Sequence, residues 1–542
     1  MSNTPFTIDR RGAMGSALAA GIALTLPGCA DAEAEAETEE LASTTATYTR
    51  YSVFSPEGQA QLATYAEAIT AMLALPATDP RNWYRQAMIH LIDCPHGNWW
   101  FFNWHRPFLG YFEQICREVT GDQTFALPYW DWTANPELPP EFYGPTTAPN
   151  ALDPTSSLFY ADSATFMSNM DAAVDAFWNA LTPAQQAKMS QRHGAMSLAE
   201  LKSSMQSAYA GGASARGADA QAGQLDKDAL AAVDIKVINT GLSATLFNAP
   251  NPPPRVMKQT IFNSAITENH SDSGKFAVIE GQPHNNVHNS IGGLMGEFLS
   301  PIDPIFWLHH ANVDRLWTVW TAEQNARGQS PFPSSDEGQA FDTEEYLFFV
   351  QPDGRPVADD ISAGLYMTPA AFDYTYGGGT QIMAESEAMV SMQDNGYILE
   401  TTVSSQALRP GAPATASVQP REEAMVAGEE TAITPQDGVA NVVFTPVDGA
   451  RHRYRLYLTG EGETPDLSLD GADYVGTFAF FGDPHAIEPT PITISLANWI
   501  AANGDRLSGP LVLHFDAVPE NVETMELAVT PGSLNSASLQ FF

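Results

Sequence analysis

The sequence predicts a mainly α-helical domain followed by an all-β, sandwich-like C-terminal domain. The chain has 542 residues, which is enough for more than one domain with a core of its own. Apolar residues recur every three or four positions in residues 58–75 and 106–119, the spacing of helices with one buried face. After residue 396, short β-branched and aromatic runs alternate with Gly, Pro and Asp, as in packed sheets.

The predicted helical domain covers residues 48–379. Its helical patterns lie at residues 48–129 and 172–230, with an interruption at residues 135–149, and fade beyond Trp317. Five prolines in residues 135–149 remove backbone donors and predict a loop. Residues 380–396 have the composition of a linker, and residues 397–542 form the predicted β-rich domain. The strands of that domain are expected at residues 397–403, 442–444, 454–458, 475–481, 492–495, 511–515 and 525–529.

Residues 1–29 have the features of an export signal. An arginine pair, Arg10-Arg11, precedes a mostly apolar run that is too short to span a bilayer. The pair resembles a twin-arginine signal and Cys29 a lipoprotein cleavage cysteine, with ordinary signal-peptidase cleavage nearby as the alternative. We therefore expect an exported protein, either periplasmic or anchored by lipid at Cys29 and facing outward. Residues 30–47 would then form an acidic, disordered tether.

The charge balance restricts the partners. The chain carries 64 acidic and 25 basic residues, a net charge of −39, which argues against binding to nucleic acid or to an anionic membrane surface. A small-molecule substrate is the remaining expectation, and the charge does not specify its class.

Two groups of histidines stand out. His284 and His288 are four residues apart, so on a helix their side chains point the same way and can bind one ion. The two groups contain seven of the twelve histidines in the chain, a clustering that core packing does not predict. Three imidazoles with an open position suit copper, zinc, iron or nickel, so the spacing leaves the metal open. A zinc hydrolase is disfavoured because zincins carry a Glu beside the first histidine, where this chain has Asn285-Asn286.

The two histidine segments and the sequence Leu-Pro-Tyr-Trp-Asp-Trp at residues 127–132 resemble the signatures of the tyrosinase, catechol oxidase (polyphenol oxidase) and molluscan haemocyanin family of type 3 binuclear copper proteins. The resemblance implies a helix bundle that holds two copper ions, with dioxygen as co-substrate and no organic cofactor. The implied ligands of the first copper are His90, His96 and His105, and those of the second are His284, His288 and His310, the latter being the second histidine of the pair 309–310.

The same resemblance implies an activity. A tyrosinase or catechol oxidase oxidises small phenolic substrates, o-diphenols to o-quinones and, in tyrosinases, monophenols to o-diphenols. A haemocyanin-like oxygen carrier and an o-aminophenol oxidase are the alternatives, because they share the site. Plant relatives also carry a C-terminal domain that covers the copper entrance, so we expect the β-rich domain to restrict access.

Cys94 lies two residues before His96, where the resemblance implies a thioether between the two side chains. An alternative follows from the cysteine count. If Cys29 is lipidated or removed, only Cys94 and Cys116 remain, and an exported protein can pair them in a disulfide.

Some further site residues are implied by the resemblance, and two aspartates are suggested by their positions one turn beyond His310 and between two tryptophans. Glu280 and Asn285 would hold a water that takes the proton of a monophenol, although Glu280 can also be a solvated carboxylate at a helix start. Phe298 would be a gate over the first copper. Asp314 and, with less support, Asp131 would orient ligand imidazoles, with a salt bridge or a helix cap as the alternatives.

The family also closes its copper domain with a tyrosine motif, which residues 374–376 resemble. An arginine near the start of the domain packs against this motif in the family, and Arg50 is the candidate here. A guanidinium over an aromatic ring would fasten the two ends of the domain together.

Overall fold

The structure is a computed structural model of the full chain, and it describes most of residues 47–541. The stretches within that range that it does not describe are 145–147, 194–196, 213–215, 249–259, 268–269, 271–273, 334, 360, 380–396, 401–405, 409–412, 421–436, 447–451, 482–488, 505–509 and 520–531. The predicted export signal, most of the tether, the linker and the strand at 525–529 therefore lie outside the described residues. All described residues belong to one compact unit, Ala46–Phe542. Among them, no helix has the length and apolar character needed to cross a membrane.

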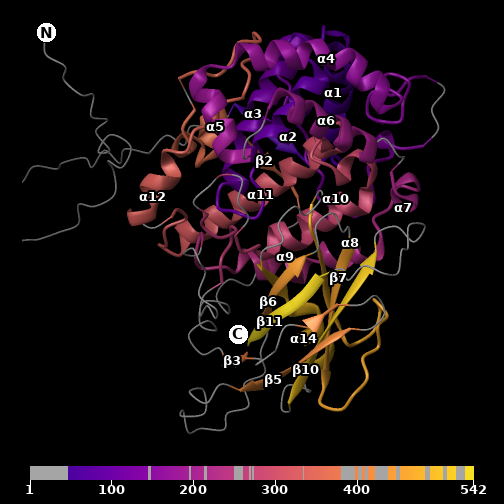
Figure 1. Ribbon diagram of the computed structural model, residues 1–542, viewed down its shortest axis with the longest axis vertical. Coiled ribbons are helices and arrows are strands. Elements are labelled where there is room, and N and C mark those ends of the chain that lie inside the picture. The colour runs from indigo at the N-terminus through magenta and orange to yellow at the C-terminus, as the bar shows by residue number, and fades with distance from the viewer. Residues whose placement is uncertain are drawn as a thin grey trace, which may run out of the picture. The chain divides into compact units, whose positions relative to one another are not determined.

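Helices dominate the first two thirds of the chain (Figure 1). They are α1 (Pro56–Ala74), α2 (Trp83–Asp93), α3 (Phe101–Thr120), α4 (Ser163–Ala180), α5 (Pro183–His193), α6 (Leu198–Gly212), α7 (Ala218–Gln221), α8 (Lys227–Ala232), α9 (Ile235–Leu242), η2 (Glu280–His284), α10 (Asn285–Ile291), α11 (Ile305–Ala326) and α12 (Ser335–Asp342). Short 3₁₀ turns are η1 (Pro140–Phe142), η3 (Gly293–Gly296), η4 (Ser300–Ile302), η5 (Ala363–Tyr366) and η6 (Pro369–Phe372). Together with the β-rich C-terminal part described below, this confirms the predicted fold class.

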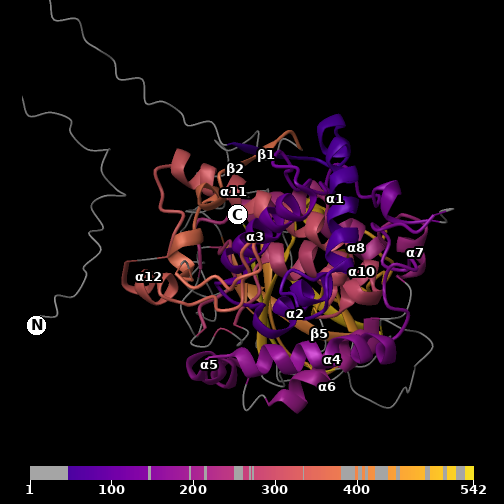
Figure 2. The same ribbon diagram turned by 90° about the horizontal axis from the view of Figure 1, so that it is seen from above.

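Ordinary helix signals set the ends of the helices that carry the site. The hydroxyl of Ser55 accepts the Gly58 backbone N–H at 3.0 Å, and Pro56 occupies the first position of α1. The helix α3 ends at Gly121, whose φ of 75° is a left-handed conformation that suits glycine. Figure 2 shows α1, α2 and α3 close together when the molecule is seen from above.

The segment η2 is one turn of wide, π-type helix that continues directly into α10. Pro283 lies inside this turn and has no N–H, so it cannot form the regular hydrogen bond to the carbonyl four residues earlier. A local widening of the helix is a common result, and such turns are frequent at functional sites. Here the wide turn begins at Glu280 and ends at His284.

The two ends of the helical part are joined by a two-stranded parallel sheet, β1 (Tyr48–Tyr51) and β2 (Tyr374–Gly377), in which Arg50 is paired with Tyr376. The Arg50 guanidinium carbon lies 3.7 Å from the centre of the Tyr374 ring. The predicted contact between Arg50 and the tyrosine motif is therefore confirmed.

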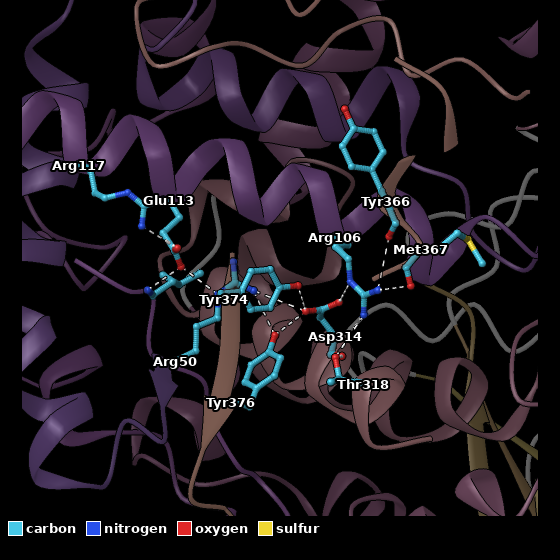
Figure 3. A network of polar contacts seen from close by, with 11 residues as sticks. Arg50, Arg106, Glu113, Arg117, Asp314, Thr318, Tyr366, Met367, Tyr374 and Tyr376 are labelled. Carbon is cyan, nitrogen blue, oxygen red and sulfur yellow. Dashed lines mark hydrogen bonds and ion pairs between the residues drawn. The ribbon is translucent and has the colours of Figure 1, made fainter. Parts of the chain in front are cut away.

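Asp314 on α11 is the centre of a buried polar network that continues from this sheet (Figure 3). One carboxylate oxygen accepts from Arg106 Nε at 2.7 Å, and the other accepts from the hydroxyls of Tyr374 and, at 2.6 Å, Tyr376. Arg50 lies 3.6 Å from the same carboxylate and also donates to Glu113 at 2.9 Å. The network links α3, α11, β1 and β2, and each of its buried charges faces an opposite one.

The C-terminal part consists mainly of antiparallel strands, which lie at the lower end of Figure 1. They are β3 (Tyr397–Glu400), β4 (Gln406–Ala407), β5 (Ala414–Pro420), β6 (Gly438–Pro446), β7 (His452–Gly460), β8 (Tyr474–Ala479), β9 (Thr490–Ser495), β10 (Leu511–Pro519) and β11 (Gly532–Phe541). They pair in the order β8-β7-β10-β5-β3-β11-β6-β9, and β4 pairs with β11. Apolar residues from both halves of this order form one core, and a short helix, α14 (Ala497–Asn503), interrupts the all-β pattern.

One strand of this part lies against the second histidine helix. Residues 474–481, which we call the cover segment, comprise β8 and the two residues after it. Three asparagine side chains on α10 donate to carbonyls of the cover segment: Asn286 to Thr477 at 2.9 Å, Asn285 to Ala479 at 2.7 Å and Asn289 to Phe480 at 3.0 Å. Ion pairs reinforce the contact.

The ion pairs lie between the start of α8 and β7, the strand that pairs with β8. Asp228 accepts from Arg455 at 2.8 Å and from the Thr477 hydroxyl at 2.5 Å, and Asp226 accepts from Arg453 at 2.6 Å. A third contact lies between α9 and β6, where Thr240 donates to Asp437 at 2.8 Å. The β-rich part is therefore held on the helical part by specific polar contacts as well as by packing.

Candidate dinuclear metal centre

The first histidine cluster is built from α2, the turn after it and α3. His90 lies near the end of α2, and Pro95 stops that helix because the residue before a proline is held in an extended conformation. The chain then turns back and presents His96, while His105 comes from the first turns of α3. The potential ligand atoms of His90, Cys94, His96 and His105 lie within 4.8 Å of one another.

The second cluster comes from the wide turn, α10 and α11. His284 ends the wide turn, His288 follows one turn later, and His309 and His310 lie near the start of α11. Their potential ligand atoms also lie within 4.8 Å of one another, and His288 Nε2 is 3.1 Å from His310 Nε2. The structure thus brings all six predicted metal ligands into two clusters, including His90.

The two clusters adjoin. The rings of His105 and His310 stack with their centres 4.1 Å apart, and those of His96 and His284 are 5.9 Å apart. Two metal ions, one in each cluster, would therefore lie next to each other. This arrangement suits a ligand that binds to both ions at once.

Hydrogen bonds from Nδ1 orient most of the imidazoles. His90 is paired with the carbonyl of Phe298, His105 with that of Phe101, and His288 with that of Met295, each at 2.7 Å. Since a carbonyl accepts only, Nδ1 carries the proton and Nε2 keeps the lone pair that binds a metal. His284 is oriented in the same way by Asn285 Oδ1 at 2.8 Å.

His309 has the opposite tautomer. The indole N–H of Trp132 donates to His309 Nδ1 at 3.1 Å, so in a neutral His309 the proton is on Nε2. A protonated Nε2 has no lone pair for a metal. Nδ1 of His310 is buried and meets no such donor among the described residues. The hydrogen-bonding pattern therefore favours the second histidine of the pair as the ligand, as the resemblance implies.

Burial keeps all of these imidazoles neutral. It lowers the pKa of His90 and of His284 to about 3, against an opposing hydrogen bond in each case. Burial also lowers the pKa values of His96, His105, His288 and His310 well below the ordinary value. The ligands are therefore ready to bind a metal without losing a proton.

Cys94 lies inside the first cluster. Its Sγ is 3.3 Å from His105 Nε2 and 3.8 Å from His96 Nε2. Both Cys94 and Cys116 are free thiols in the structure, so the disulfide considered above is not present between them. The short distance to the ring of His96 is compatible with the implied thioether, which the structure does not contain.

Glu280 is fully buried, so the solvated carboxylate considered as its alternative is wrong. Its two oxygens accept from the backbone N–H of Gly97 at 2.6 Å and from the hydroxyl of Ser264 at 2.5 Å. Burial raises the pKa of Glu280 to about 8, against the lowering effect of these two hydrogen bonds. Asn285 orients His284 and donates to Ala479, so both ends of its amide have partners.

Two phenylalanines lie against the histidine clusters. The ring centre of the predicted gate, Phe298, lies 5.8 Å from that of His96. Phe481, at the end of the cover segment, lies closer, with its ring centre 4.7 Å from that of His96 and 4.4 Å from that of His288. Phe481 is only 7% exposed and also contacts Phe298 at 5.3 Å. The cover segment therefore places a side chain over both clusters.

Of the two aspartates expected to orient imidazoles, Asp314 is engaged elsewhere, and the role of Asp131 stays a prediction. Asp314 is fully engaged by arginines and tyrosines in the network of Figure 3 and does not hydrogen-bond to a histidine. Asp131 accepts from the backbone of Ala134 at 3.3 Å and lies 3.7 Å from Arg315. Backbone carbonyls and one asparagine orient the imidazoles, and the sequence pattern gave no signal for these.

The chemistry of the donor atoms indicates which metals the two clusters can hold. The donors of both clusters are neutral imidazoles, and the first cluster also has the thiol of Cys94. Neither cluster has a carboxylate, so the donor set suits copper or zinc and not magnesium or calcium. Nε2 of His90 and of His284 is buried without a hydrogen-bond partner. A buried polar atom that lacks a partner is costly unless a metal binds it, so the residues fit an ion in each cluster.

The comparisons with known proteins agree with this. Residues 69–323 match the model of the common central domain of tyrosinase. The chain is 28% identical over 284 residues to the latent form of a chloroplastic polyphenol oxidase from Prunus armeniaca, covering 48% of this chain and 38% of that protein. It is 27% identical over 309 residues to a tyrosinase from a Hahella strain, covering 48% of this chain and 51% of that protein. The matches thus span about two fifths to one half of these relatives.

Solved structures show the same fold. A latent aurone synthase, a polyphenol oxidase, aligns over 92% of this chain and 90% of its own with a TM-score of 0.57 at 17% identity. A latent apple tyrosinase aligns over 91% of this chain and 97% of its own with a TM-score of 0.54 at 18% identity. The cofactor that the clusters and the family share is a pair of copper ions. The central part of the chain, residues 69–323, is thus a tyrosinase domain, as in the tyrosinase and polyphenol oxidase family of type 3 copper proteins.

Proposed function

We propose that the protein oxidises small phenols with dioxygen at its two-copper centre, o-diphenols to o-quinones and monophenols to o-diphenols. The observation that supports this most directly is the pair of adjoining three-histidine clusters in a tyrosinase domain. When bound, the copper ions supply the binding and activation of dioxygen. The protein residues orient the ions, exclude water and handle the protons.

In this proposal His90, His96 and His105 hold the first copper, and His284, His288 and His310 hold the second. His309 is the matched control, because it is as buried as His310 but has its proton on the wrong nitrogen. His310→Ala should lower the copper content to about one ion per chain and abolish oxidation. His309→Gln should keep both ions. Full copper content and activity in His310→Ala would contradict the assignment.

The deciding measurement for the activity is oxygen uptake by the copper-loaded protein with a panel of mono- and diphenols and o-aminophenols. We expect uptake with diphenols and, more slowly, with monophenols. Reversible oxygen binding without turnover of catechol would favour an oxygen carrier. Turnover of o-aminophenols alone would favour an aminophenol oxidase.

Glu280 and Asn285 are proposed to hold the water that accepts the proton of a monophenol. A phenol has a pKa near 10 and must be deprotonated to bind copper, so a base is needed at neutral pH. In the structure the Asn285 amide is taken up by Ala479 of the cover segment, so the water site would form only when that segment moves away. Glu280→Gln should then depress monophenol turnover much more than diphenol turnover. An equal loss of both would make the enzyme a catechol oxidase.

The cover segment is proposed to keep the enzyme latent. Phe481 packs on His96 and His288, where a phenol ring would have to lie, and hydrogen bonds from α10 hold the segment in place. Phe298 is proposed to remain as the gate once the segment has moved. Removal of the β-rich part, in a chain that ends near Gly379, should therefore raise the rate with bulky diphenols.

We further propose a thioether between Cys94 and His96, in support of which Cys94 Sγ lies 3.8 Å from His96 Nε2. The bond forms by loss of two hydrogens, which dioxygen can accept during copper loading. The intact mass of the copper-loaded protein should show this deficit, and the deficit should persist after treatment with a reductant. A deficit that disappears on reduction would indicate a disulfide.

The predicted location is also a proposal: an exported protein, either periplasmic or anchored through Cys29. Fractionation of cells that make the wild type and Cys29→Ala distinguishes the two. A lipoprotein should move from the membrane to the soluble exported fraction in the variant. Retention of both forms in the cytoplasm would contradict export.

A further inference from the structure

A cavity of about 330 Å³ lies on the opposite side of α2 from the metal centre. Its walls come from α2, α4, the turn after α4 and residues 347–356. Most of the lining is apolar, including Met88, Ile89, Phe177 and Phe349. Met88 and Ile89 directly precede His90 on α2, but their side chains line this cavity while His90 faces the copper ligands. The cavity is thus distinct from the site described above.

Arg85 is the one charged residue among the described residues that line the cavity. It is three and four residues before Met88 and Ile89, so the three side chains share one face of α2. Arg85 is only 7% exposed, and its Nε has no hydrogen-bond partner. Among the described residues, its Nη1 donates one long hydrogen bond of 3.4 Å to the carbonyl of Ala77, and its guanidinium carbon lies 5.3 Å from the centre of the Phe177 ring.

No described carboxylate forms an ion pair with Arg85. The nearest candidate, Asp79, is held by Arg81 through contacts of 2.8 and 3.1 Å and is therefore already paired. Burial lowers the pKa of Arg85 to about 10, with a small opposing effect of Asp79, so the side chain is still charged at neutral pH. The other buried arginines of the helical core, such as Arg50 and Arg106, face carboxylates directly.

A buried guanidinium whose described contacts are one long hydrogen bond and one aromatic ring lacks a counter-charge, which is costly. The natural partner is a planar anion that accepts two parallel hydrogen bonds. The rest of the cavity would bury an apolar body. We propose that this cavity binds a small amphiphilic carboxylate, with the carboxylate on Arg85 and the apolar chain along Met88, Phe177 and Phe349. This inference does not depend on the proposed phenol oxidation.

The test uses the copper-loaded full chain, with octanoate as the probe and octanol as its uncharged analogue, followed by calorimetry. The wild type should bind octanoate about ten- to a hundredfold more tightly than octanol, the range expected for a charge-assisted pair of hydrogen bonds. Arg85→Met keeps the length and the apolar stem and should remove this preference. Arg355→Met, which changes an exposed, paired arginine outside the cavity lining, should leave it unchanged.

A second variant tests the place of binding. Ala176 lies on α4 at the exposed rim of the cavity, so Ala176→Phe should be tolerated and should block the mouth. Octanoate binding that is lost in both Arg85→Met and Ala176→Phe supports the proposal. Equal binding of octanoate and octanol to the wild type, no binding at all, or octanoate binding that survives in either variant would overturn it. If Arg85→Met does not fold, the Ala176→Phe variant and the wild-type comparison still decide.

Discussion

The molecule is held together in two contrasting ways. The Asp314 network, which joins the ends of the helical part, is fully buried and consists of charges that face opposite charges. The cover segment is held by three neutral amide-to-carbonyl hydrogen bonds and by ion pairs whose arginines are 15–20% exposed. If the Asp314 network is broken, its charges stay buried and unpaired, away from water. If the cover segment separates from the helical part, water can replace each lost hydrogen bond and ion pair. The Asp314 network is therefore suited to a permanent connection, and the contacts of the cover segment are suited to one that can be released.

The sharpest test of this contrast is Asp314→Asn. Removing one partner from a buried ion network costs about 3–5 kcal/mol, because the remaining charges stay buried and unpaired. We expect the free energy of unfolding in urea, followed by tryptophan fluorescence, to fall by this amount. Asp353→Asn is the control, because its partner Arg355 is 76% exposed and such pairs contribute about 0–1 kcal/mol. Equal effects of the two changes would remove the distinction.

The second test opens the cover without breaking the network. Phe481→Ala should raise the rate of oxidation of a bulky diphenol about tenfold, which corresponds to a loss of about 1.4 kcal/mol of closure. The unfolding of the helical part should change little. Phe480→Leu is the control, since Phe480 packs on Phe276 and Phe444 in the β core and not on the histidines. An unchanged rate in Phe481→Ala would mean that Phe481 does not limit access.

A smaller change is expected at the hydrogen bonds of the cover segment. Asn289 donates to the carbonyl of Phe480 and is not one of the clustered histidine ligands, so Asn289→Ala tests the attachment of the cover segment. Loss of a hydrogen bond worth about 1 kcal/mol should raise the rate with a bulky diphenol about fivefold. Asn169→Ala, which removes an exposed hydrogen bond within α4, should have no effect on the rate. A rise in both variants would point to a general loosening.

A last test concerns pH. Burial raises the pKa of Asp437 to about 7, against hydrogen bonds from Thr240 and Gly438, whereas an unfolded Asp has a pKa near 3.9. Between these two values the folded state holds a proton that the unfolded state has lost, so this contribution to stability falls as pH rises from about 4 to about 7. Asp437→Asn should flatten this part of the urea-stability profile. A parallel profile for the variant would exclude Asp437 as the cause.

Much of the fold was readable from the sequence. The helical spacing predicts α1 and α3, and alternating apolar runs predict β6, β7, β8, β9 and β10. Three strands of the C-terminal part were missed. The strand β4 has only two residues, and the Ala- and Ser-rich sequences of β5 and β11 carry little β-branched or aromatic signal. The helix α14 was missed because its seven residues are too few for a helical period to show.

The site was readable only in part. The six histidines were identifiable because few chains place so many imidazoles at these spacings. The contact of Phe481 with them was not, since it depends on how the β-rich part docks. The role of Asp314 was misjudged for a similar reason. One turn after His310 it could face an imidazole, but its partners come from α3 and β2, which are distant in the sequence.

The pairing of β1 with β2 has a consequence for the order of synthesis. The helical part needs Gly377 to close its parallel sheet and needs nothing later in the chain to complete both histidine clusters. The sheet that carries the cover segment is centred on β11, which pairs with β3 and β6 and ends at Phe541. A nascent chain therefore completes its histidine clusters well before the last strand exists. Metal ions can enter during that interval, before the protein closes over its own active site.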